Sequence, residues 1–174
     1  PPGPLGRSDE STGGSPRQWG VVTRHPGGPQ SAAGILGVLE AAGVPYRLLP
    51  SGKVALAAAL DSLDATGNVL LPACIPHGVV GALRARGLDP RFYRVQRDLQ
   101  PEYGDLFRRL DRETAALLVV HYFGVPQPRL DDVVAIAGTL DVPVIDDNSH
   151  AVLSRRDGRL LGTAGTFGFA SLHK

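Results

Sequence analysis

The segment LLVVHYFGVPQPRLDDVVAIAGTLDVPVI, residues 117–145, joins two short apolar runs through a helical pattern. The runs at 117–120 and 142–145 are apolar at nearly every position, which is typical of strands buried on both faces of a sheet. Between them, the apolar residues of 130–137 recur with the spacing of one helix face. Strand, helix and strand in this order predict a βαβ unit with parallel strands.

The same alternation extends outward from this unit in both directions. Further strand patterns lie at 46–49, 69–71, 92–95 and 167–174, and further helical patterns lie at 35–42, 56–63, 79–83 and 103–110. This repeated order predicts an α/β fold with a mostly parallel sheet and helices on both faces. In such sheets ligands bind beyond the carboxyl ends of the strands, so the residues that follow each strand are candidates for function.

Composition narrows the possible functions of this chain of 174 residues. The net charge of +1 comes with scattered basic residues, which gives no indication of nucleic-acid binding. No stretch approaches the roughly 20 apolar residues of a membrane span, and no charged and apolar leader is present. The single cysteine, Cys74, suits a reducing cytoplasm, and its apolar neighbours predict a buried, unreactive thiol rather than a nucleophile.

The first 30 residues differ in amino-acid composition from the rest of the chain. They are rich in proline, glycine and serine, and Trp19 is the only Phe, Trp or Tyr among them. Such a segment buries too little apolar surface to offset the entropy of ordering it. We therefore predict that residues 1–30 are mostly disordered and that residues 31–174 form the folded domain.

Three predicted strands end in turns that carry polar residues. Ser51, Gly52 and Lys53 open a helix, where backbone N–H groups and a hydroxyl can bind a phosphate; alternatively, Ser51 only caps the helix. His77 could stack on an aromatic ligand or cap its helix. His121 could face a ligand, but a core histidine with satisfied hydrogen bonds is the favoured interpretation.

An acidic pair and a terminal lysine suggest a cofactor. Asp146 and Asp147 follow a buried strand, and at most one of them can face a site because neighbouring side chains on an extended chain point to opposite sides. A carboxylate that keeps a pyridine nitrogen protonated, a lysine that forms an imine and a serine that binds a phosphate are the needs of a pyridoxal phosphate (PLP) site. Lys174 supplies the lysine and Ser171 the serine, and His150 could reach the ligand's phenolate oxygen. Alternatively, Asp147 caps a helix and Lys174 is a surface lysine.

Five motifs follow one another along residues 48–174 in a characteristic order. They are Ser51-Gly52-Lys53-Val54-Ala55-Leu56, Leu71-Pro72-Ala73-Cys74, His121-Tyr122-Phe123-Gly124, Ile145-Asp146-Asp147-Asn148-Ser149-His150 and the segment that ends at Lys174. Together they resemble the DegT/DnrJ/EryC1/StrS family of PLP-dependent sugar aminotransferases, which have the fold-type-I architecture of aspartate aminotransferase. The resemblance implies that Asp147 rather than Asp146 pairs with the pyridinium nitrogen. It also implies that His150 replaces a glutamine that contacts the ring oxygen, and that Lys174 forms the imine.

The sequence departs from the family pattern in its phosphate and stacking positions. Lys53 and Val54 replace hydroxyl residues, so phosphate binding there must rely on backbone N–H groups and on the Lys53 ammonium. Phe169 stands where the family carries a serine, and Ser171 is our substitute for it. His77 is our candidate for the aromatic residue that stacks on the cofactor.

The resemblance also implies an activity. It suggests transfer of an amino group, from glutamate as donor, to a nucleotide-linked keto-sugar in the biosynthesis of cell-surface polysaccharides or secondary metabolites. Relatives that dehydrate sugars carry histidine in place of the lysine, so Lys174 favours transamination. Because fold-type-I sites are completed by a partner subunit and a carboxyl-terminal small domain, we expect a cytoplasmic homodimer when full length and an inactive fragment alone.

Two other interpretations compete with this one. The chain could be a catalytically inactive remnant of such an enzyme. It could also be a receiver-type signalling domain, which places an acidic pair and a lysine on a parallel sheet. In receivers, however, the acidic pair ends the first strand, whereas here it ends a late one.

Overall fold

The computed structural model describes residues 19–23 and 29–171. Their helices and strands are, in chain order, β1 (Trp19–Thr23), α1 (Pro29–Ala41), β2 (Tyr46–Leu49), α2 (Gly52–Ser62), β3 (Asn68–Pro72), α3 (His77–Arg84), β4 (Asp89–Tyr93), α4 (Tyr103–Arg109), β5 (Thr114–Val120), the 3₁₀ turn η1 (Tyr122–Gly124), α5 (Leu130–Thr139), β6 (Val144–Asn148), β7 (Arg155–Arg156), β8 (Arg159–Leu160) and β9 (Phe167–Ser171).

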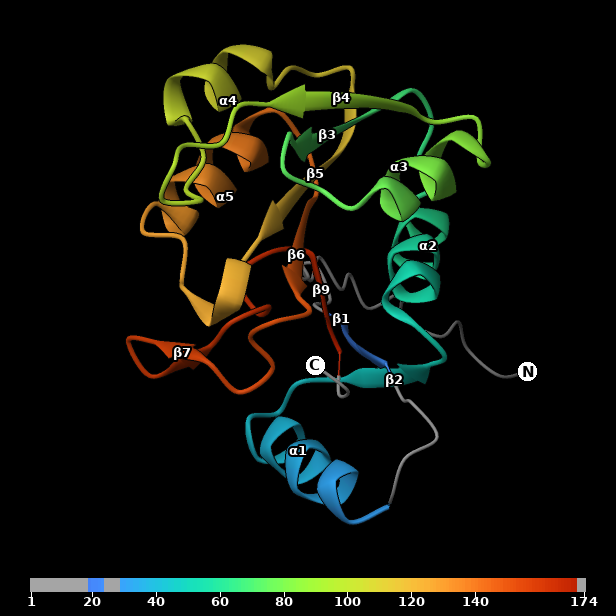
Figure 1. The fold of residues 1–174 in the computed structure, drawn as a ribbon, viewed down its shortest axis with the longest axis vertical. Helices are drawn as coiled ribbons and strands as arrows, with labels where there is room; N and C mark the ends of the chain where they lie inside the picture. Colours follow the sequence, from blue (N-terminus) through green and yellow to red (C-terminus); the bar gives the residue numbers. More distant parts are fainter. Residues whose placement is uncertain (1–18, 24–28, 172–174) are drawn as a thin grey trace, which may run out of the picture.

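A seven-stranded sheet forms the centre of the fold, with the strand order β2-β1-β9-β6-β5-β3-β4. Every pairing between these strands is parallel, and the two apolar runs of the βαβ unit form the adjacent strands β5 and β6. Helices α4 and α5 lie on one side of the sheet and α2 and α3 on the other (Figure 1). The predicted α/β fold with a parallel sheet is confirmed.

The alternation of side chains along the central strands produces two apolar cores. In β5, Leu118 and Val120 pack with α2 and α3, whereas Leu117 and Val119 pack with α4 and α5. This two-residue period explains why the central strands are apolar at every position. It also sends successive side chains at the strand ends to opposite faces of the sheet.

Strand β1 lies in a segment whose sequence predicted disorder. Trp19–Thr23 pair in parallel with β2 on one side and with β9 on the other, so their backbone groups are bonded within the sheet. Our prediction of a mostly disordered segment over residues 1–30 did not anticipate this strand. Trp19, Val21 and Val22 are residue types that favour strands, but this short pattern lies in surroundings rich in proline and glycine, and pairing with strands distant in sequence stabilises it.

The approach to β9 is unusually close, which accounts for the small residues there. A Cβ atom on Gly168 would collide with the backbone carbonyl of Gly162, and one on Gly165 would collide with the carbonyl of Val144. Gly162 itself has a positive φ of 85° and lies against the side chain of Asn148. Glycine at these positions therefore lets the chain turn tightly and enter the sheet between β1 and β6.

A short hairpin precedes this approach. Strands β7 and β8 pair antiparallel around Asp157 and Gly158, both of which have positive φ. Asp-Gly is a favoured two-residue hairpin turn, a signal that our sequence analysis did not use. Leu160 of this hairpin packs against Leu39 of α1, which ties α1 to the rest of the domain.

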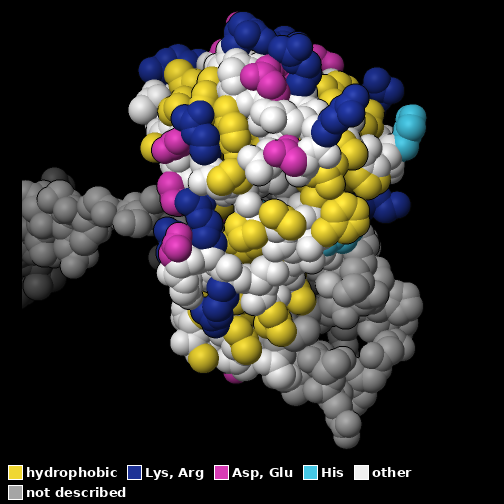
Figure 2. Space-filling model, turned by 60° about the vertical axis from the view of Figure 1, so that its left-hand side comes forward, with side chains coloured by type: hydrophobic (Ala, Val, Ile, Leu, Met, Phe, Trp, Pro, Cys, Tyr) yellow, Lys and Arg dark blue, Asp and Glu magenta, His cyan; other side chains and the backbone are white. Residues whose placement is uncertain are grey.

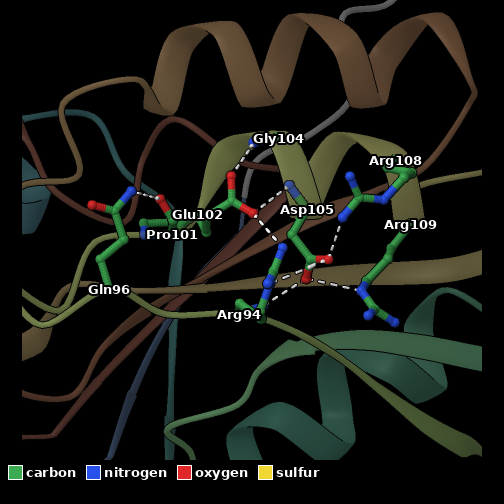
Figure 3. Close-up of polar contacts among 8 residues, drawn as sticks. All are labelled: Arg94, Gln96, Pro101, Glu102, Gly104, Asp105, Arg108 and Arg109. Carbon is green, nitrogen blue, oxygen red and sulfur yellow. Dashed lines mark hydrogen bonds and ion pairs between the residues drawn. The ribbon is translucent and has the colours of Figure 1, made fainter.

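Acidic and basic side chains are interspersed on the face that Figure 2 shows. The densest group surrounds Asp105 in the first turn of α4, whose carboxylate is within 4 Å of Arg94, Arg108 and Arg109 (Figure 3). In the described ranges, every helix is too short or too polar to cross a membrane.

Candidate functional site

A cavity of about 670 Å³ opens at the carboxyl ends of β3, β5, β6 and β9, beside the start of α2. Six of the eight residues that we predicted for the site line it: Ser51, Gly52, Lys53, Asp147, His150 and Ser171. They come from segments up to 120 residues apart in the sequence (51 to 171). The parallel sheet brings these segments together because all of its strands end at one edge.

The start of α2 forms one wall of the cavity. Ser51 has an extended backbone, and its Oγ accepts a hydrogen bond of 3.3 Å from the N–H of Val54, so it caps the helix. Ser51 is thus a helix cap, and the same turn also lies in the cavity wall. The N-terminus of a helix attracts anions through its N–H groups and its dipole. The side chain of Lys53 extends toward the start of α3, and its Nζ lies 3.7 Å from the position that a Cβ atom on Gly78 would occupy.

The acidic pair divides between the two faces of the sheet, as its alternation predicted. Asp147 lies at the cavity wall with 8% of its surface exposed, and its Oδ1 accepts a 2.8 Å hydrogen bond from the N–H of Ser149. Asp146 is fully buried and does not line the cavity. The Asp147 carboxylate is therefore the member of the pair that a ligand in the cavity can meet.

His121 is a core histidine bonded to the other carboxylate. Its Nε2 lies 3.2 Å from Oδ1 of Asp146, and its Nδ1 accepts a hydrogen bond from the N–H of Gln127. Because Nδ1 accepts, a neutral His121 carries its proton on Nε2 and donates it to Asp146. Asp146 also accepts from the N–H of Gly165, which connects it to the turn before β9. The favoured interpretation of His121 is confirmed.

Tyr122 lines the cavity, although our sequence analysis did not assign it a role. Its hydroxyl donates to the backbone carbonyl of Cys74, which joins η1 to the segment between β3 and α3. Burial raises the pKa of Tyr122 well above its usual range, and negative charge at Cys74 and Asp147 raises it further. Tyr122 is therefore a neutral hydrogen-bond donor under ordinary conditions.

Cys74 is exposed and lines the cavity, so the prediction of a buried thiol is wrong. Strand β3 ends at Pro72, and Cys74 follows in the connection to α3 at the edge of the sheet. The apolar run that suggested burial is split between the strand and this connection.

Of the two remaining predicted site residues, one does not line the cavity and the other is not described by the structure. His77 is the exposed first residue of α3, and its neighbours Pro76 and Gly78 line the cavity in its place. Lys174 lies outside the described residues. Ser171, at the end of β9, is 3% exposed and faces the cavity as predicted.

Ser149 and Phe169 complete the list of polar and aromatic residues that sequence reasoning missed. Phe169 lies two residues before Ser171 on β9, so both side chains point to the same face of the sheet. Its ring is 3.6 Å from the position that a Cβ of Gly52 would occupy. The two-residue period of β9 was a signal that could have identified Phe169.

Known proteins with the same sequence pattern identify the family. The model of the DegT/DnrJ/EryC1/StrS aminotransferase family matches residues 42–174. The chain belongs to this family. GDP-perosamine synthase of Escherichia coli O157:H7 is 29% identical over 125 residues, a match that covers 68% of this chain and 34% of that protein.

Solved structures of aminotransferases share the fold. The aminotransferase TlmJ from Streptoalloteichus hindustanus is 28% identical, with a TM-score of 0.66 over 79% of this chain and 39% of that one. The sugar aminotransferase CalS13 from Micromonospora echinospora is 26% identical, with a TM-score of 0.54 over 71% of this chain and 37% of that one. The chain thus spans about a third of the length of the curated relative that it matches.

The described cavity fits the cofactor associated with the DegT/DnrJ/EryC1/StrS family. A phosphate needs N–H and hydroxyl donors, which the start of α2 and Ser171 supply. A pyridinium N–H needs a buried carboxylate, which Asp147 supplies. The rings of Tyr122 and Phe169 provide apolar wall between these polar groups.

Proposed function

We propose that the protein is a PLP-dependent aminotransferase that moves an amino group from glutamate to a nucleotide-linked keto-sugar. The observation that carries this proposal is the convergence of Asp147, Ser171 and the start of α2 on one cavity at the carboxyl edge of a parallel sheet. A carboxylate and an anion-binding helix start, lying opposite a short strand that leads to a lysine, suit a cofactor with a pyridine ring and a phosphate.

Each residue then has a separate task. Asp147 holds a proton on the pyridine nitrogen, while Ser51, Ser171 and the N–H groups of α2 bind the phosphate, with the Lys53 ammonium beside them. Lys174 would attach the cofactor, and its freed amine would then carry a proton between the reacting carbon of the substrate and the carbon of the cofactor that takes up the amino group. PLP, when bound, supplies an electron sink for the charge that develops at the reacting carbon.

Names of relatives support the sugar acceptor. One relative is a GDP-perosamine synthase, and one solved structure is described as a sugar aminotransferase. The donor, the cytoplasmic location and a homodimeric state rest on the resemblance of the motifs. Because this chain spans about a third of its relative, we propose that it does not catalyse amino transfer by itself.

Cofactor binding can be tested on the chain directly. PLP is titrated into the purified chain, the absorbance of the bound cofactor is followed, and the complex is reduced with borohydride before peptide mapping. We expect label on Lys174, and much weaker binding after Asp147→Asn. Asp89→Asn, which alters an exposed carboxylate on β4, serves as the matched control. Label on other lysines only, in both the chain and the whole protein, would refute the assignment of Lys174.

Amino transfer itself requires the whole protein. Incubation with glutamate and a nucleotide-linked keto-sugar is expected to yield an amino sugar and 2-oxoglutarate in equal amounts. Loss of product after Lys174→Ala in a protein that still folds supports the proposal. Product formation that is insensitive to Lys174→Ala contradicts it.

A further inference from the structure

Phe123 has an unusual backbone and an unusual exposure. Its φ of 53° and ψ of 25° lie in the left-handed region, which glycine adopts readily and bulky residues adopt rarely. The side chain is 76% exposed, so burial in a core does not hold the residue in place. A strained, exposed aromatic residue beside a cavity calls for a different physical reason.

The contacts of Phe123 converge on His150. The two rings stack with their centroids 5.5 Å apart and their planes 17° from parallel. The backbone N–H of Phe123 also points at the ring and donates to Nδ1 of His150 at 3.5 Å. The left-handed backbone thus brings both the ring and the N–H of a single residue to one imidazole.

The turn that carries Phe123 is fixed on the side of His150. Gly124 follows with a positive φ of 81°, and a Cβ atom there would lie 3.1 Å from Oγ of Ser154 and 3.3 Å from the carbonyl oxygen of His150. Its N–H donates to the carbonyl of His121. Glycine at this position allows η1 to pack closely on the segment after β6.

These contacts select one tautomer of His150. A backbone N–H can donate only to an unprotonated nitrogen, so Nδ1 is the acceptor and a neutral imidazole carries its proton on Nε2. His150 lines the cavity described above. The imidazole is therefore prepared as an Nε2–H donor in a ring plane that the stacked Phe123 defines.

We propose that Phe123 is a positioning residue that holds His150 as an Nε2–H donor for an acceptor oxygen of the bound ligand. The identity of that oxygen, the phenolate of PLP, rests on the proposed function. The orientation of His150 is a property of the chain without its ligand.

Two substitutions at position 123 separate the ring from the backbone. Phe123→Gly removes the stacked ring, keeps the N–H and suits the left-handed backbone. Phe123→Tyr keeps the ring and is the matched control. In the ¹⁵N-labelled full chain at alkaline pH, long-range ¹H–¹⁵N correlations report which nitrogen of His150 carries the proton. Thermal unfolding and PLP affinity are measured on the same samples.

We expect a single Nε2–H tautomer in the wild type and in Phe123→Tyr. In Phe123→Gly the imidazole is no longer held by the stacked ring, so it should rotate away from the retained N–H and populate an averaged mixture of tautomers. Unfolding of Phe123→Gly is expected at an equal or higher temperature, because the strain is relieved. Its PLP affinity should fall roughly threefold to tenfold, the effect of one poorly oriented hydrogen bond. This opposite movement of stability and orientation distinguishes a positioning role from a structural one.

A mixture of tautomers in the wild type, or one tautomer kept in Phe123→Gly, overturns the inference. Failure of the wild-type chain to bind PLP contradicts the proposed function of the site instead, and leaves the tautomer measurement as an independent test of Phe123.

Discussion

Replacing Asp105 by asparagine removes one charge from the group drawn in Figure 3 without changing its shape. The carboxylate is 1% exposed. It accepts from the N–H of Arg94 at 2.9 Å, from Arg108 at 2.7 Å and from Arg109 at 2.8 Å. Burial alone would raise the pKa of Asp105, but these donors outweigh it and lower the pKa from 3.8 to about 2.

This lowered pKa gives the size and the pH dependence of the effect. Each unit of pKa corresponds to about 1.4 kcal/mol, so the lowering of the Asp105 pKa corresponds to about 2.5 kcal/mol of folding free energy. Solvent screening around the half-exposed arginines reduces this stabilisation to between about 1 and 2 kcal/mol. Because the folded-state pKa lies below the unfolded one, the stabilisation is complete above about pH 5. It is lost as the pH falls from about 4 toward 2, with about half remaining near pH 3.

Urea unfolding of the wild type and Asp105→Asn across this pH range measures the difference. The gap in unfolding free energy should be constant at neutral pH and should close in acid. Asp89→Asn is the matched control, since Asp89 is exposed and pairs with Arg91 at 3.6 Å, and it should change stability by less than about 0.5 kcal/mol. An effect of Asp105→Asn no larger than that of Asp89→Asn, or one that does not vary with pH, would refute this reasoning.

Two further predictions concern the packing of β9 and the hydroxyl of Tyr122. Gly168→Ala should destabilise the chain by about 1–3 kcal/mol in urea unfolding, because the added methyl group collides with the backbone of Gly162. The control is Gly81→Ala in α3, where the methyl group meets nothing within 4 Å and should stabilise the chain by up to about 1 kcal/mol. Equal effects of the two substitutions would contradict the close approach of Gly168 to Gly162. Since burial raises the pKa of the Tyr122 hydroxyl, the stability that this hydroxyl contributes is present below about pH 10 and is lost at higher pH. Tyr122→Phe should remove this alkaline loss of stability, together with the hydrogen bond to Cys74. An unchanged dependence of the unfolding free energy on alkaline pH would contradict this prediction.

The sequence predicted the candidate site best where the alternation of side chains along a strand could be combined with the position at which that strand ends. Asp146 and Asp147 differ only by one residue, yet the alternation of an extended chain assigns them to opposite faces, and the structure confirms this division. The turn at Ser51 was recognisable because it combines two local signals, a strand end and a helix cap. Local rules of this kind need no knowledge of distant residues.

The residues that were missed depend on distant contacts. Tyr122 belongs to the cavity because its hydroxyl reaches Cys74, 48 residues away, and Cys74 is exposed because its strand ends two residues earlier. His77 has an aromatic ring that could stack on a ligand, but it is the exposed first residue of α3. Boundaries of elements and side-chain directions at their ends are set by packing, which a single sequence does not contain.

The position of β9 has a consequence for the way the chain folds. Strand β9 separates the pair β1–β2 from β6, and its partner β1 lies 148 residues earlier in the sequence, between Trp19 and Phe167. The strands β3 to β6 can associate by short crossovers, whereas β1 and β2 have no neighbour in the main sheet until residues 167–171 are in place. Closure of such a long loop slows folding. We therefore expect β1 and β2 to join last, with their edges open to other chains during synthesis.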